Sequence, residues 1–157
     1  MLISGINSCT SCILHNPEKI IEIFINIEKK SYFSKLIEQN KLNNKTRLLK
    51  KSDFSKLGIK NDRFFNDIVI RREKYKPFNL EDILKNNEKS LIVVADQITD
   101  QNNLGNIIRT ALLIGADGLM LSEHSSADNN DVTSLTSSGA VEVLNYHVSK
   151  TITRSIE

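Results

Sequence analysis

The fold is decided by residues 91–115, which read LIVVADQITDQNNLGNIIRTALLIG. The first five residues are a continuous apolar run, as expected for a strand buried on both faces of a parallel sheet. The last twelve place apolar residues three and four positions apart, which predicts a helix from about Leu104 to Ile114 with one apolar face. A strand followed by a polar loop and a helix is typical of the start of a doubly wound α/β unit.

The polar loop of this stretch is the expected ligand site, because open α/β sheets bind ligands at the carboxyl ends of their strands. Either Asn102 or Asn103 can cap the helix by accepting a hydrogen bond from a backbone N–H group. The alternation of strand and helix then continues. The further predicted elements are a short strand at 119–121, a helix at 128–137, a strand region at 141–148 and a helix in TITRSIE at 151–157.

Arg109 is the only Lys or Arg among residues 90–149. A guanidinium near the start of a helix, in an otherwise acidic part of the chain, is suited to contact a phosphate or a ribose. The alternative is a structural ion pair between Arg109 and a carboxylate of the loop, either Asp96 or Asp100. The residues alone leave both roles open.

The first part of the chain predicts a separate, smaller α/β domain over residues 1–75. Isoleucines alternate with mostly polar residues from Ile21 to Ile27, which is the period-two pattern of a strand. Residues 76–89 are polar, contain Pro77 and predict a linker. The other predicted elements of this domain are a helix at 5–16, a helix capped by Ser31, a strand at 46–50, a short helix between Ser52 and Gly58, and a strand at 67–71.

The 157 residues carry 21 Lys and Arg against 19 Asp and Glu, but the charge is unevenly distributed. Residues 1–89 hold 18 basic and 11 acidic residues, a net of +7, whereas residues 90–157 hold 3 and 8, a net of −5. A basic half suits a polyanion such as RNA; a genome rich in A and T would also enrich lysine and leave only a solvated basic surface. The candidate RNA contacts, which lie in two basic clusters with aromatic residues nearby, are Lys50, Lys51, Arg71 and Arg72.

Composition argues against membrane, secreted and metal-binding classes. No apolar run approaches the ~20 residues of a membrane span, and the N-terminus lacks the basic and apolar regions of a secretory signal, so we expect a cytoplasmic protein. Cys9 and Cys12 form one CxxC pair followed by His15, but a zinc site needs four ligands, so no metal is expected. The run DNND at 128–131 lacks the glycine and glutamate of a calcium loop and predicts a turn with a helix cap.

The loop and helix resemble motif 1 of the SpoU/TrmH family of RNA 2′-O-ribose methyltransferases. In that motif an Asp, three residues and Asp-Pro precede one residue, Asn-Leu-Gly, and an apolar helix that carries Arg and ends in Gly. The matching residues are Asp96, Asp100, Asn103, Leu104, Gly105, Arg109, Ala111 and Gly115. Residues 138–142, SGAVE, resemble the Ser/Cys-Gly-Ala-x-Glu step that follows in the family, and Gly5 matches the glycine of its opening motif.

The resemblance covers the whole chain and implies its fold. Residues 1–75 correspond to a small RNA-substrate-binding α/β domain related to a class of ribosomal proteins. Residues 90–157 correspond to the first half of a Rossmann-like SPOUT, or trefoil-knot, methyltransferase domain. Members of the family are generally homodimers.

The resemblance also implies a reaction, the transfer of a methyl group from S-adenosylmethionine to a guanosine ribose of 23S ribosomal RNA. The counterpart of Asn103 helps to position the ribose, and that of Arg109 contacts the target nucleotide. We favour an electrostatic role for Arg109, because a guanidinium with a pKa above ~12 is a poor proton acceptor. Glu142 belongs to an earlier step than the catalytic glutamate of the family.

The sequence departs from the family pattern in three places. Gln101 replaces the usual Pro, and FNDI at 65–68 replaces His-Gln-Gly-Ile. The later motifs, a loop with the catalytic Glu and an Ile-Pro-Met…Ser-Leu-Asn-Val-Ser segment, have no counterpart, and they include the segment that binds the methyl donor. We therefore expect a truncated chain that is inactive alone and leave its cofactor contacts unassigned. The alternatives are a non-catalytic RNA-binding remnant and an unfinished sheet that pairs with another chain.

Overall fold

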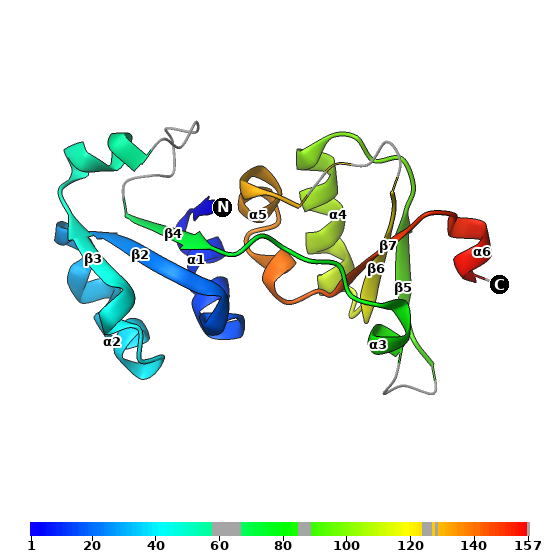
Figure 1. Cartoon of the computed structure of the whole chain (residues 1–157), viewed down its shortest axis with the longest axis horizontal. Helices are drawn as coiled ribbons and strands as arrows, with labels where there is room; N and C mark the ends of the chain where they lie inside the picture. Colours follow the sequence, from blue (N-terminus) through cyan, green and yellow to red (C-terminus); the bar gives the residue numbers. More distant parts are fainter. Residues whose placement is uncertain (58–66, 85–88, 124–126, 128, 157) are drawn as a thin grey trace. The chain divides into compact units, whose positions relative to one another are not determined.

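A computed structural model of the chain describes residues 1–57, 67–84, 89–123, 127 and 129–156. The chain divides into two compact units, which we call unit 1 (Met1–Lys74) and unit 2 (Tyr75–Glu157) (Figure 1). Each contains a β-sheet and helices, so the predicted mixed α/β class is confirmed. Among the described helices, none is long and apolar enough to cross a membrane.

Unit 1 is built on a four-stranded mixed sheet with the order β1-β4-β2-β3. Strand β4 runs antiparallel to both β1 and β2, and β3 runs parallel to β2. The two inner strands, β4 and β2, therefore have a hydrogen-bonded neighbour on each side. The strands are β1 (Leu2–Ser4), β2 (Ile20–Asn26), β3 (Thr46–Leu49) and β4 (Ile68–Arg72).

Helices cover both faces of this sheet. On one face, Ile23 and Ile70 are fully buried against Cys12 of α1 and Phe33 of α2. On the other face, Phe54 of η4 packs with Phe24 and Val69. The helical elements are α1 (Ile6–His15), η1 (Pro17–Lys19), η2 (Ile27–Lys29), α2 (Lys30–Gln39), η3 (Asn43–Lys45) and η4 (Lys51–Leu57).

Unit 1 differs from the sequence prediction at three points. The pattern does not predict β1, because three residues are too few to show a period of two. A register shift between Ile20 and Glu22 leaves Ile21 54% exposed, although the alternation placed it with the buried isoleucines. Helix α2 has Lys29 as its N-cap, without a side-chain hydrogen bond, so Ser31 is not the cap. The predicted helix stop at Gly58 lies outside the described residues.

Unit 2 contains a three-stranded parallel sheet with the order β5-β6-β7. Val93, Leu119 and Val148 belong to a core that α4 and η6 cover. Towards the other face, Ile83 of α3 would contact a Cβ added at Gly118. The elements are α3 (Leu80–Leu84), β5 (Ile92–Ala95), α4 (Gln101–Leu113), β6 (Gly118–Ser122), α5 (Asp131–Thr136), η6 (Ala140–Glu142), β7 (Tyr146–Ser149) and α6 (Ile152–Ile156).

Two glycines determine where α4 lies and where it ends. A Cβ at Gly105 would lie 2.7 Å from the Cβ of Thr136, so α4 can approach α5 this closely only because residue 105 has no side chain. At the other end of the helix, Gly115 adopts φ 77°. The backbone N–H of Gly115 donates to Leu112 and that of the next residue donates to Ala111, which is the hydrogen-bond pattern of a Schellman motif.

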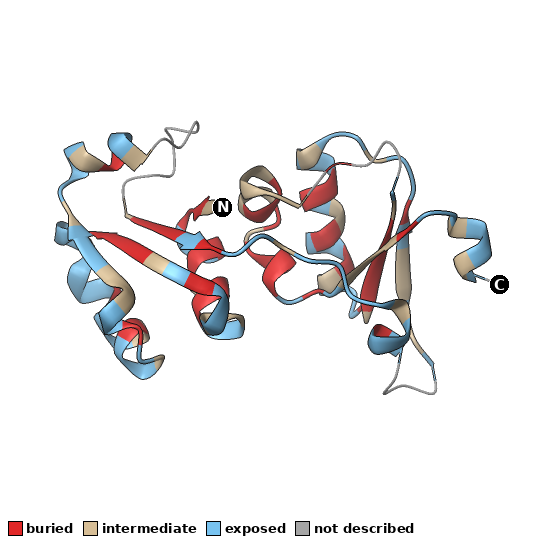
Figure 2. Ribbon diagram, viewed as in Figure 1, coloured by how far each residue is buried: buried red, intermediate tan, exposed pale blue. Residues whose placement is uncertain are grey.

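Strand β5, which the apolar run LIVVA forms, lies at the edge of its sheet. The run LIVVA predicts burial on both faces, but β5 is an edge strand, and Leu91 and Val94 are 48% and 42% exposed. Figure 2 shows this contrast with β6, which has neighbours on both sides and is almost entirely buried. As an edge strand, β5 has a hydrogen-bonded neighbour on one side only, and its other side is open among the described residues.

Candidate functional site

Hydrogen bonds of its backbone connect the loop after β5 to the end of β6 and to Ala127. Gln97 adopts φ 54°, a left-handed conformation that is uncommon for a residue with a side chain. Its N–H donates to Oγ of Ser122, at the carboxyl end of β6, with an N···O distance of 2.9 Å. The N–H of Ala127 donates to the carbonyl of Ile98 in the same loop. The loop therefore lies at the carboxyl ends of β5 and β6, as the sequence predicted for a ligand site.

The N-cap of α4 is Asp100, not Asn102 or Asn103. The carboxylate of Asp100 accepts a hydrogen bond from the backbone N–H of Asn103 at 2.8 Å. Asn102 instead accepts a hydrogen bond from the hydroxyl of Thr136 in α5 at 3.1 Å. Because a carboxylate caps a helix as well as an amide does, the prediction placed the cap two or three residues too late. The side chain of Asn103 is exposed in the first turn of the helix.

Asn103 and Arg109 share α4 but do not converge on one point. Six residues of α-helix separate them, which places their Cα atoms about 120° apart around the axis and about 9 Å apart along it. Arg109 is exposed and forms no ion pair with any described residue, so pairing with Asp96 or Asp100 is not seen. Its charge is available to a ligand that lies along this part of the helix.

The segment that follows β6 contains α5, which packs against α4. Asn130 caps α5 by accepting hydrogen bonds from the N–H groups of Val132 and Thr133, at 2.9 and 3.2 Å, as the sequence predicted for a cap in this run. Further along, Ser138 and Gly139 adopt φ 53° and 84°. These two residues reverse the chain between α5 and η6, which explains a glycine at position 139.

Glu142 lies in the interior of unit 2. Its side chain is buried, with 7% exposure, and accepts a hydrogen bond from the hydroxyl of Tyr75 at 2.7 Å. The resemblance places Glu142 at an earlier step than the catalytic glutamate of the family. Asn129, in the preceding loop, has a side-chain amide whose nitrogen and oxygen are buried without a hydrogen-bond partner.

An apolar groove of about 270 Å³ lies beside α4. Its lining residues carry no charge, and only two of them are polar, Asn106 and Thr110. S-adenosylmethionine carries a carboxylate, an ammonium, a sulfonium and a ribose diol, each of which needs a polar or charged partner when buried. The groove therefore does not fit the methyl donor, and we assign no step to a donor bound there. The residues that line the groove are Val93, Asn106, Ile107, Thr110, Ala111 and Ile114.

In unit 1 the structure brings together two arginines that the sequence separates by 24 positions. The carboxylate of Glu22 on β2 contacts Arg47 on β3 and, at 2.9 Å, Arg71 on β4. The guanidinium of Arg71 also lies 5.5 Å from the ring centroid of Phe24. Arg47 precedes Lys50 by three residues and is not among the four candidate RNA contacts. Its place beside Arg71 follows from the strand order, which the sequence does not show.

The four predicted RNA contacts do not form one cluster. Lys50 and Lys51 are exposed and follow directly after β3. The last residue of β3, Leu49, pairs with Asn26, the last residue of β2. Arg71 pairs with Glu22, four residues earlier on β2, which is about 13 Å away along the strand. Arg72 is 4% exposed, and its Nε donates to the carbonyl of Glu73 at 3.0 Å.

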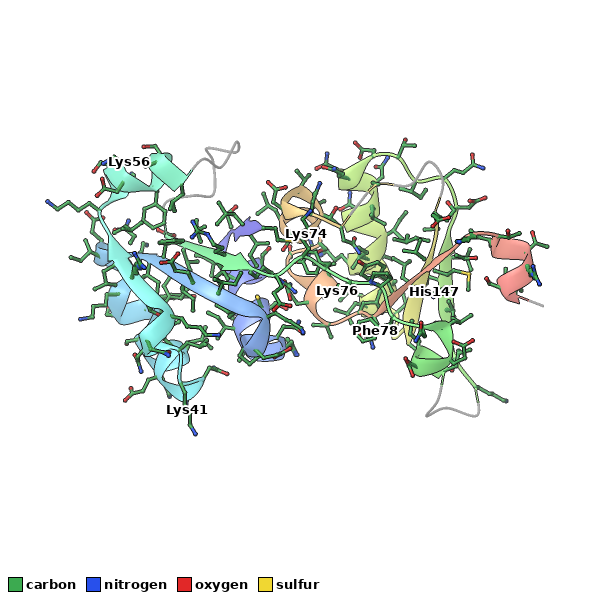
Figure 3. The ribbon with its side chains drawn as sticks, viewed as in Figure 1. Lys41, Lys56, Lys74, Lys76, Phe78 and His147 are labelled. Atoms are coloured by element: carbon green, nitrogen blue, oxygen red, sulfur yellow. The ribbon has the colours of Figure 1, made fainter. Side chains whose placement is uncertain are left out.

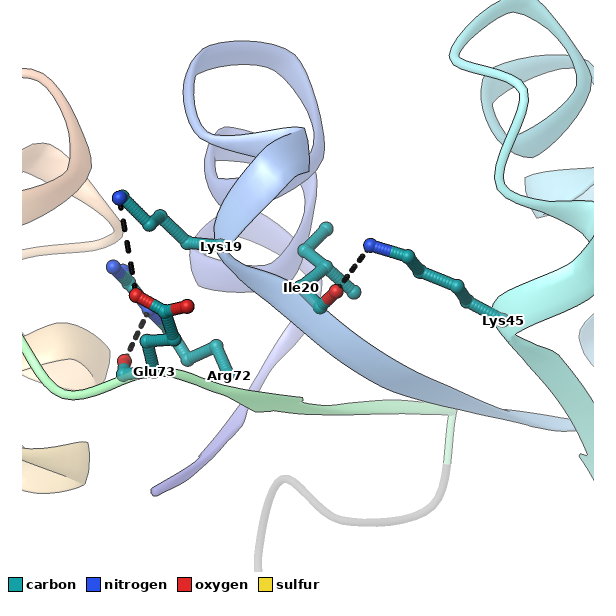
Figure 4. Close-up of polar contacts among 5 residues, drawn as sticks. All are labelled: Lys19, Ile20, Lys45, Arg72 and Glu73. Atoms are coloured by element: carbon teal, nitrogen blue, oxygen red, sulfur yellow. Dashed lines mark hydrogen bonds and ion pairs between the residues drawn. The ribbon is translucent and has the colours of Figure 1, made fainter.

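Burial of Arg72 changes the prediction, because a buried guanidinium cannot reach a phosphate in solvent. Figure 4 shows its hydrogen bond to Glu73, whose carboxylate also lies 3.8 Å from Lys19. The same view shows Lys45 donating to the carbonyl of Ile20, which ties η3 to β2. Other lysines, such as Lys41 and Lys56, project from the surface of this unit (Figure 3).

Cys9 and His147, whose side chains could in principle bind a metal ion, each contact backbone carbonyls instead. Cys9 and Cys12 are fully buried and are not in a disulfide, and the thiol of Cys9 lies 3.7 Å from the carbonyls of Ile3 and Ile68. In unit 2, Nδ1 of His147 lies 2.9 Å from the carbonyl of Phe78 (Figure 3). The described residues contain no group of three or more His, Cys, Asp or Glu side chains arranged to hold a metal ion.

Comparison with known proteins finds a family model that matches most of unit 2. Residues 90–157 match the model of the SpoU rRNA Methylase family. The chain is 28% identical over 147 residues to the 23S rRNA (guanosine-2′-O-)-methyltransferase RlmB of Haemophilus influenzae, covering 90% of this chain and 59% of that protein. It is 26% identical to the RlmB protein of Neisseria meningitidis over 157 aligned residues, covering 98% of this chain and 62% of that protein.

Solved structures show the same fold. The SpoU methyltransferase AviRb of Streptomyces viridochromogenes, in complex with the cofactor AdoMet, aligns with a TM-score of 0.72 and 23% identity. The alignment covers 99% of this chain and 57% of that one. The chain thus spans about three fifths of the length of the curated relatives and solved structures it matches.

Proposed function

Because residues 90–157 match the model of the SpoU rRNA Methylase family, we propose that this chain acts in the 2′-O-methylation of RNA. The substrate is large-subunit ribosomal RNA, the modified group is a guanosine ribose, and the methyl donor is S-adenosylmethionine. The observation that carries the proposal is the placement of motif 1. Its loop lies at the carboxyl ends of two parallel strands, and its helix presents Asn103 and Arg109 to solvent.

We assign Arg109 to stabilising the negative charge that develops during the reaction. Attack by a ribose oxygen develops negative charge on that oxygen, and a fixed cation nearby stabilises it. Arg109 is exposed and makes no ion pair in the described part of the chain, so its charge is not already neutralised. Because a guanidinium is a poor proton acceptor, its role is electrostatic. Asn103, one turn or more away, is assigned to positioning the ribose.

Unit 1 is assigned to RNA binding. Lys50, Lys51 and Arg71 are its exposed candidate contacts, within a unit whose formal charge is +7. Arg71 lies over Phe24 and pairs with Glu22. We therefore expect it to contribute less than Lys50 and Lys51, neither of which forms an ion pair within the described part of the chain. The compartment proposed is the cytoplasm, and the assembly proposed is the homodimer that the resemblance implies.

Binding and turnover are tested with the same RNA. The purified chain is titrated against a 23S ribosomal RNA transcript at several salt concentrations, and methyl transfer is followed with labelled S-adenosylmethionine. The double variant Lys50→Gln, Lys51→Gln should lower the slope of log affinity against log salt by about 1.4, since each phosphate contact on a single strand contributes ~0.7. The control is Lys30→Gln, Lys35→Gln, which removes two exposed lysines of α2.

Turnover separates two functions. The methyltransferase function predicts a methylated ribose in the product RNA. It also predicts that Arg109→Ala on α4 folds but loses turnover, whereas Arg154→Ala on α6 keeps it. The apolar lining of the groove beside α4 favours a second candidate, a non-catalytic RNA-binding protein. That function predicts salt-dependent RNA binding with no turnover and no heat of binding on titration with S-adenosylmethionine. Absence of both RNA binding and turnover would contradict both functions.

A further inference from the structure

We propose that Arg47 and Arg71 together bind a phosphate group of RNA, and that Glu22, which lies between them, competes with this phosphate. We call these three residues the arginine pair site. Arg71 is already a candidate RNA contact, whereas Arg47 is added by the structure. The inference rests on the RNA binding proposed for unit 1 and identifies the surface of that unit that the RNA contacts.

The site joins three adjacent strands through one carboxylate. Glu22 lies on β2, between β3, which carries Arg47, and β4, which carries Arg71. Its Oε1 atom contacts Nε of Arg47, and its Oε2 atom lies 2.9 Å from Nη1 of Arg71. A guanidinium carries five N–H donors, so these contacts use only part of each arginine. The other donors suit a phosphate, which a guanidinium binds through two parallel hydrogen bonds.

Exposure and charge both favour an anion at this site. The side chains of Arg47 and Arg71 are 72% and 46% exposed, whereas that of Glu22 is 13% exposed. One arginine is enough to neutralise Glu22, so the second leaves an excess of positive charge at the surface. A structural ion pair needs no second arginine. We therefore interpret the second guanidinium as a contact for a ligand with negative charge.

Both arginines are held in place before any ligand binds. Arg47 is held by Glu22, and Arg71 is held by Glu22 and by Phe24, whose ring centroid lies 5.5 Å from the guanidinium carbon. Phe24 is 5% exposed and belongs to a packed core, so it offers Arg71 a fixed surface. Side chains that are already ordered lose less conformational entropy on binding. The arrangement therefore favours phosphate binding more than two mobile arginines would.

The arginine pair site shares one face of the sheet with η4. Phe24 pairs in register with Arg47 and packs against Phe54 of η4. Arg71 lies over the ring of Phe24, so its guanidinium is on that face as well. The other face is covered by α2, through Phe33. A phosphate on the arginine pair site therefore lies on the face that η4 covers in part, opposite α2.

Arg47 also connects candidate contacts that are otherwise apart. Lys50 follows Arg47 by three residues, which is about 10 Å in an extended chain. Lys51 is the first residue of η4, on the same face of the sheet. The path from Arg71 through Arg47 to the two lysines follows this face, so one RNA strand can contact all four cations in turn. This continuity favours RNA as the ligand over an isolated anion.

The site is tested with the full chain and the same 23S ribosomal RNA transcript, titrated over a range of salt concentrations. Arg47→Gln leaves Arg71 neutralised by Glu22, so one phosphate contact is lost. We expect the slope of log affinity against log salt to fall by about 0.7, which is about fivefold in affinity at 0.1 M salt. Arg47→Lys keeps the charge and should keep the slope. The matched control is Lys35→Gln, which removes one exposed cation of α2, on the other face.

Glu22→Gln separates RNA binding from a structural role. It removes the competing charge, while its amide oxygen can still accept a hydrogen bond from one arginine. RNA binding should therefore tighten about twofold to fivefold. If the three residues only hold the strands together, the variant lowers the stability of unit 1 and leaves RNA affinity unchanged. Glu38→Gln, which removes an exposed carboxylate of α2, is the control and should change neither. Denaturant unfolding checks that each variant is folded.

Unchanged RNA affinity and salt slope in Arg47→Gln, beside salt-dependent binding by the unaltered chain, would overturn the proposal. So would unchanged or weaker binding by Glu22→Gln. Inorganic phosphate is the second probe. If phosphate binding depended on Arg47 while RNA binding did not, the ligand would be a free anion and the proposal would be wrong. Absence of RNA binding by the unaltered chain would instead remove the RNA binding proposed for unit 1, so the two failures are distinguishable.

Discussion

Strands β2 and β5 are both rich in β-branched apolar residues, but their surroundings differ. β2 lies between β4 and β3, and Ile23 and Ile25 are almost completely buried. β5 has one neighbour, and Val94 is 42% exposed on a strand that is apolar throughout. The difference shows that an apolar run determines whether a strand forms, whereas the number of its neighbours determines how much of it is buried. Neighbours come from the topology, which a single run of sequence does not contain.

The two units also differ in how they satisfy their polar groups. All five ion pairs among the described residues lie in unit 1, including the pair of arginines on Glu22. In unit 2, side chains such as Asp100 and Asn130 bond to backbone N–H groups at helix ends. Unit 1 therefore exposes charge that is partly neutralised, and unit 2 leaves the charge of Arg109 unopposed.

The largest effect we expect separates the two strands directly. Ile23→Ala, in the core of β2, should lower the free energy of unfolding of unit 1 by about 3–4 kcal/mol, because it deletes fully buried methylene groups and leaves a cavity. Val94→Ala on β5 should cost less than about 1 kcal/mol, since much of that side chain is already in water. Hydrogen exchange in denaturant, read separately for β2 and β5, measures both. Equal losses would contradict the comparison.

A glycine of unit 2 should produce the next largest effect. Gly105→Ala puts a Cβ 2.7 Å from Thr136 and 3.1 Å from backbone atoms of Thr133 and Ser137, so the two helices must separate. We expect a loss of about 2 kcal/mol in the stability of unit 2. The control is Asn106→Ala, at an exposed position of the same helix, which should be close to neutral. A neutral Gly105→Ala variant would show that α4 and α5 can move apart freely.

A smaller effect distinguishes the helix cap from the proposed site. Asp100→Ala removes the side chain that caps α4 and should cost about 1 kcal/mol of stability in unit 2. Asn103→Ala should leave stability almost unchanged, because only its backbone N–H takes part in the cap. Thermal or denaturant unfolding compares the two variants. If Asn103→Ala destabilised unit 2 as much as Asp100→Ala, a purely functional role for Asn103 would be untenable.

The smallest effect concerns an ion pair on the surface of unit 1. The ammonium of Lys56, 2.7 Å from a carboxylate oxygen of Asp53, holds the pKa of Asp53 below its ordinary value by hydrogen bonding and charge. Any stability from this lowered pKa is present above the unfolded-state pKa and is lost as the pH falls through the folded-state pKa. Lys56→Gln should raise the pKa of Asp53 towards its ordinary value, measurable by NMR titration of that carboxyl. Lys56 is exposed and Asp53 is partly exposed, so solvent screens the pair and the melting temperature should hardly change.

Much of the fold follows from local patterns in the sequence. The period-two alternation around Ile23 and the helical spacing from Leu104 correctly indicate β2 and α4. Boundaries are less accurate, because Asp100 and Lys29 begin helices that neighbouring residues were expected to cap. The match of residues 90–157 to the SpoU rRNA Methylase family was also predictable, since the residues of motif 1 lie within one short stretch, residues 96–115.

Features that depend on the order of strands were not predictable. Glu22 meets Arg47 and Arg71 only because β3 and β4 flank β2. The exposed edge of β5 depends on which strands are present beside it, and the burial of Arg72 depends on tertiary packing. Arg109 and Asn103 could be singled out from sequence, but their angular separation on α4 required the helix boundaries. The chemistry assigned to them remains a proposal.

The pairing of β1 with β4 has a consequence for synthesis on the ribosome. Leu2 lies opposite Arg71, so the first strand of unit 1 waits for the last strand before it can pair. At roughly 5–20 residues per second, the chain spends several seconds with Leu2–Ser4 unpaired. In unit 2 each new strand lies beside the one made just before it, in the order β5, β6, β7. Unit 1 therefore completes its sheet in one late step, while the sheet of unit 2 can grow strand by strand as it emerges.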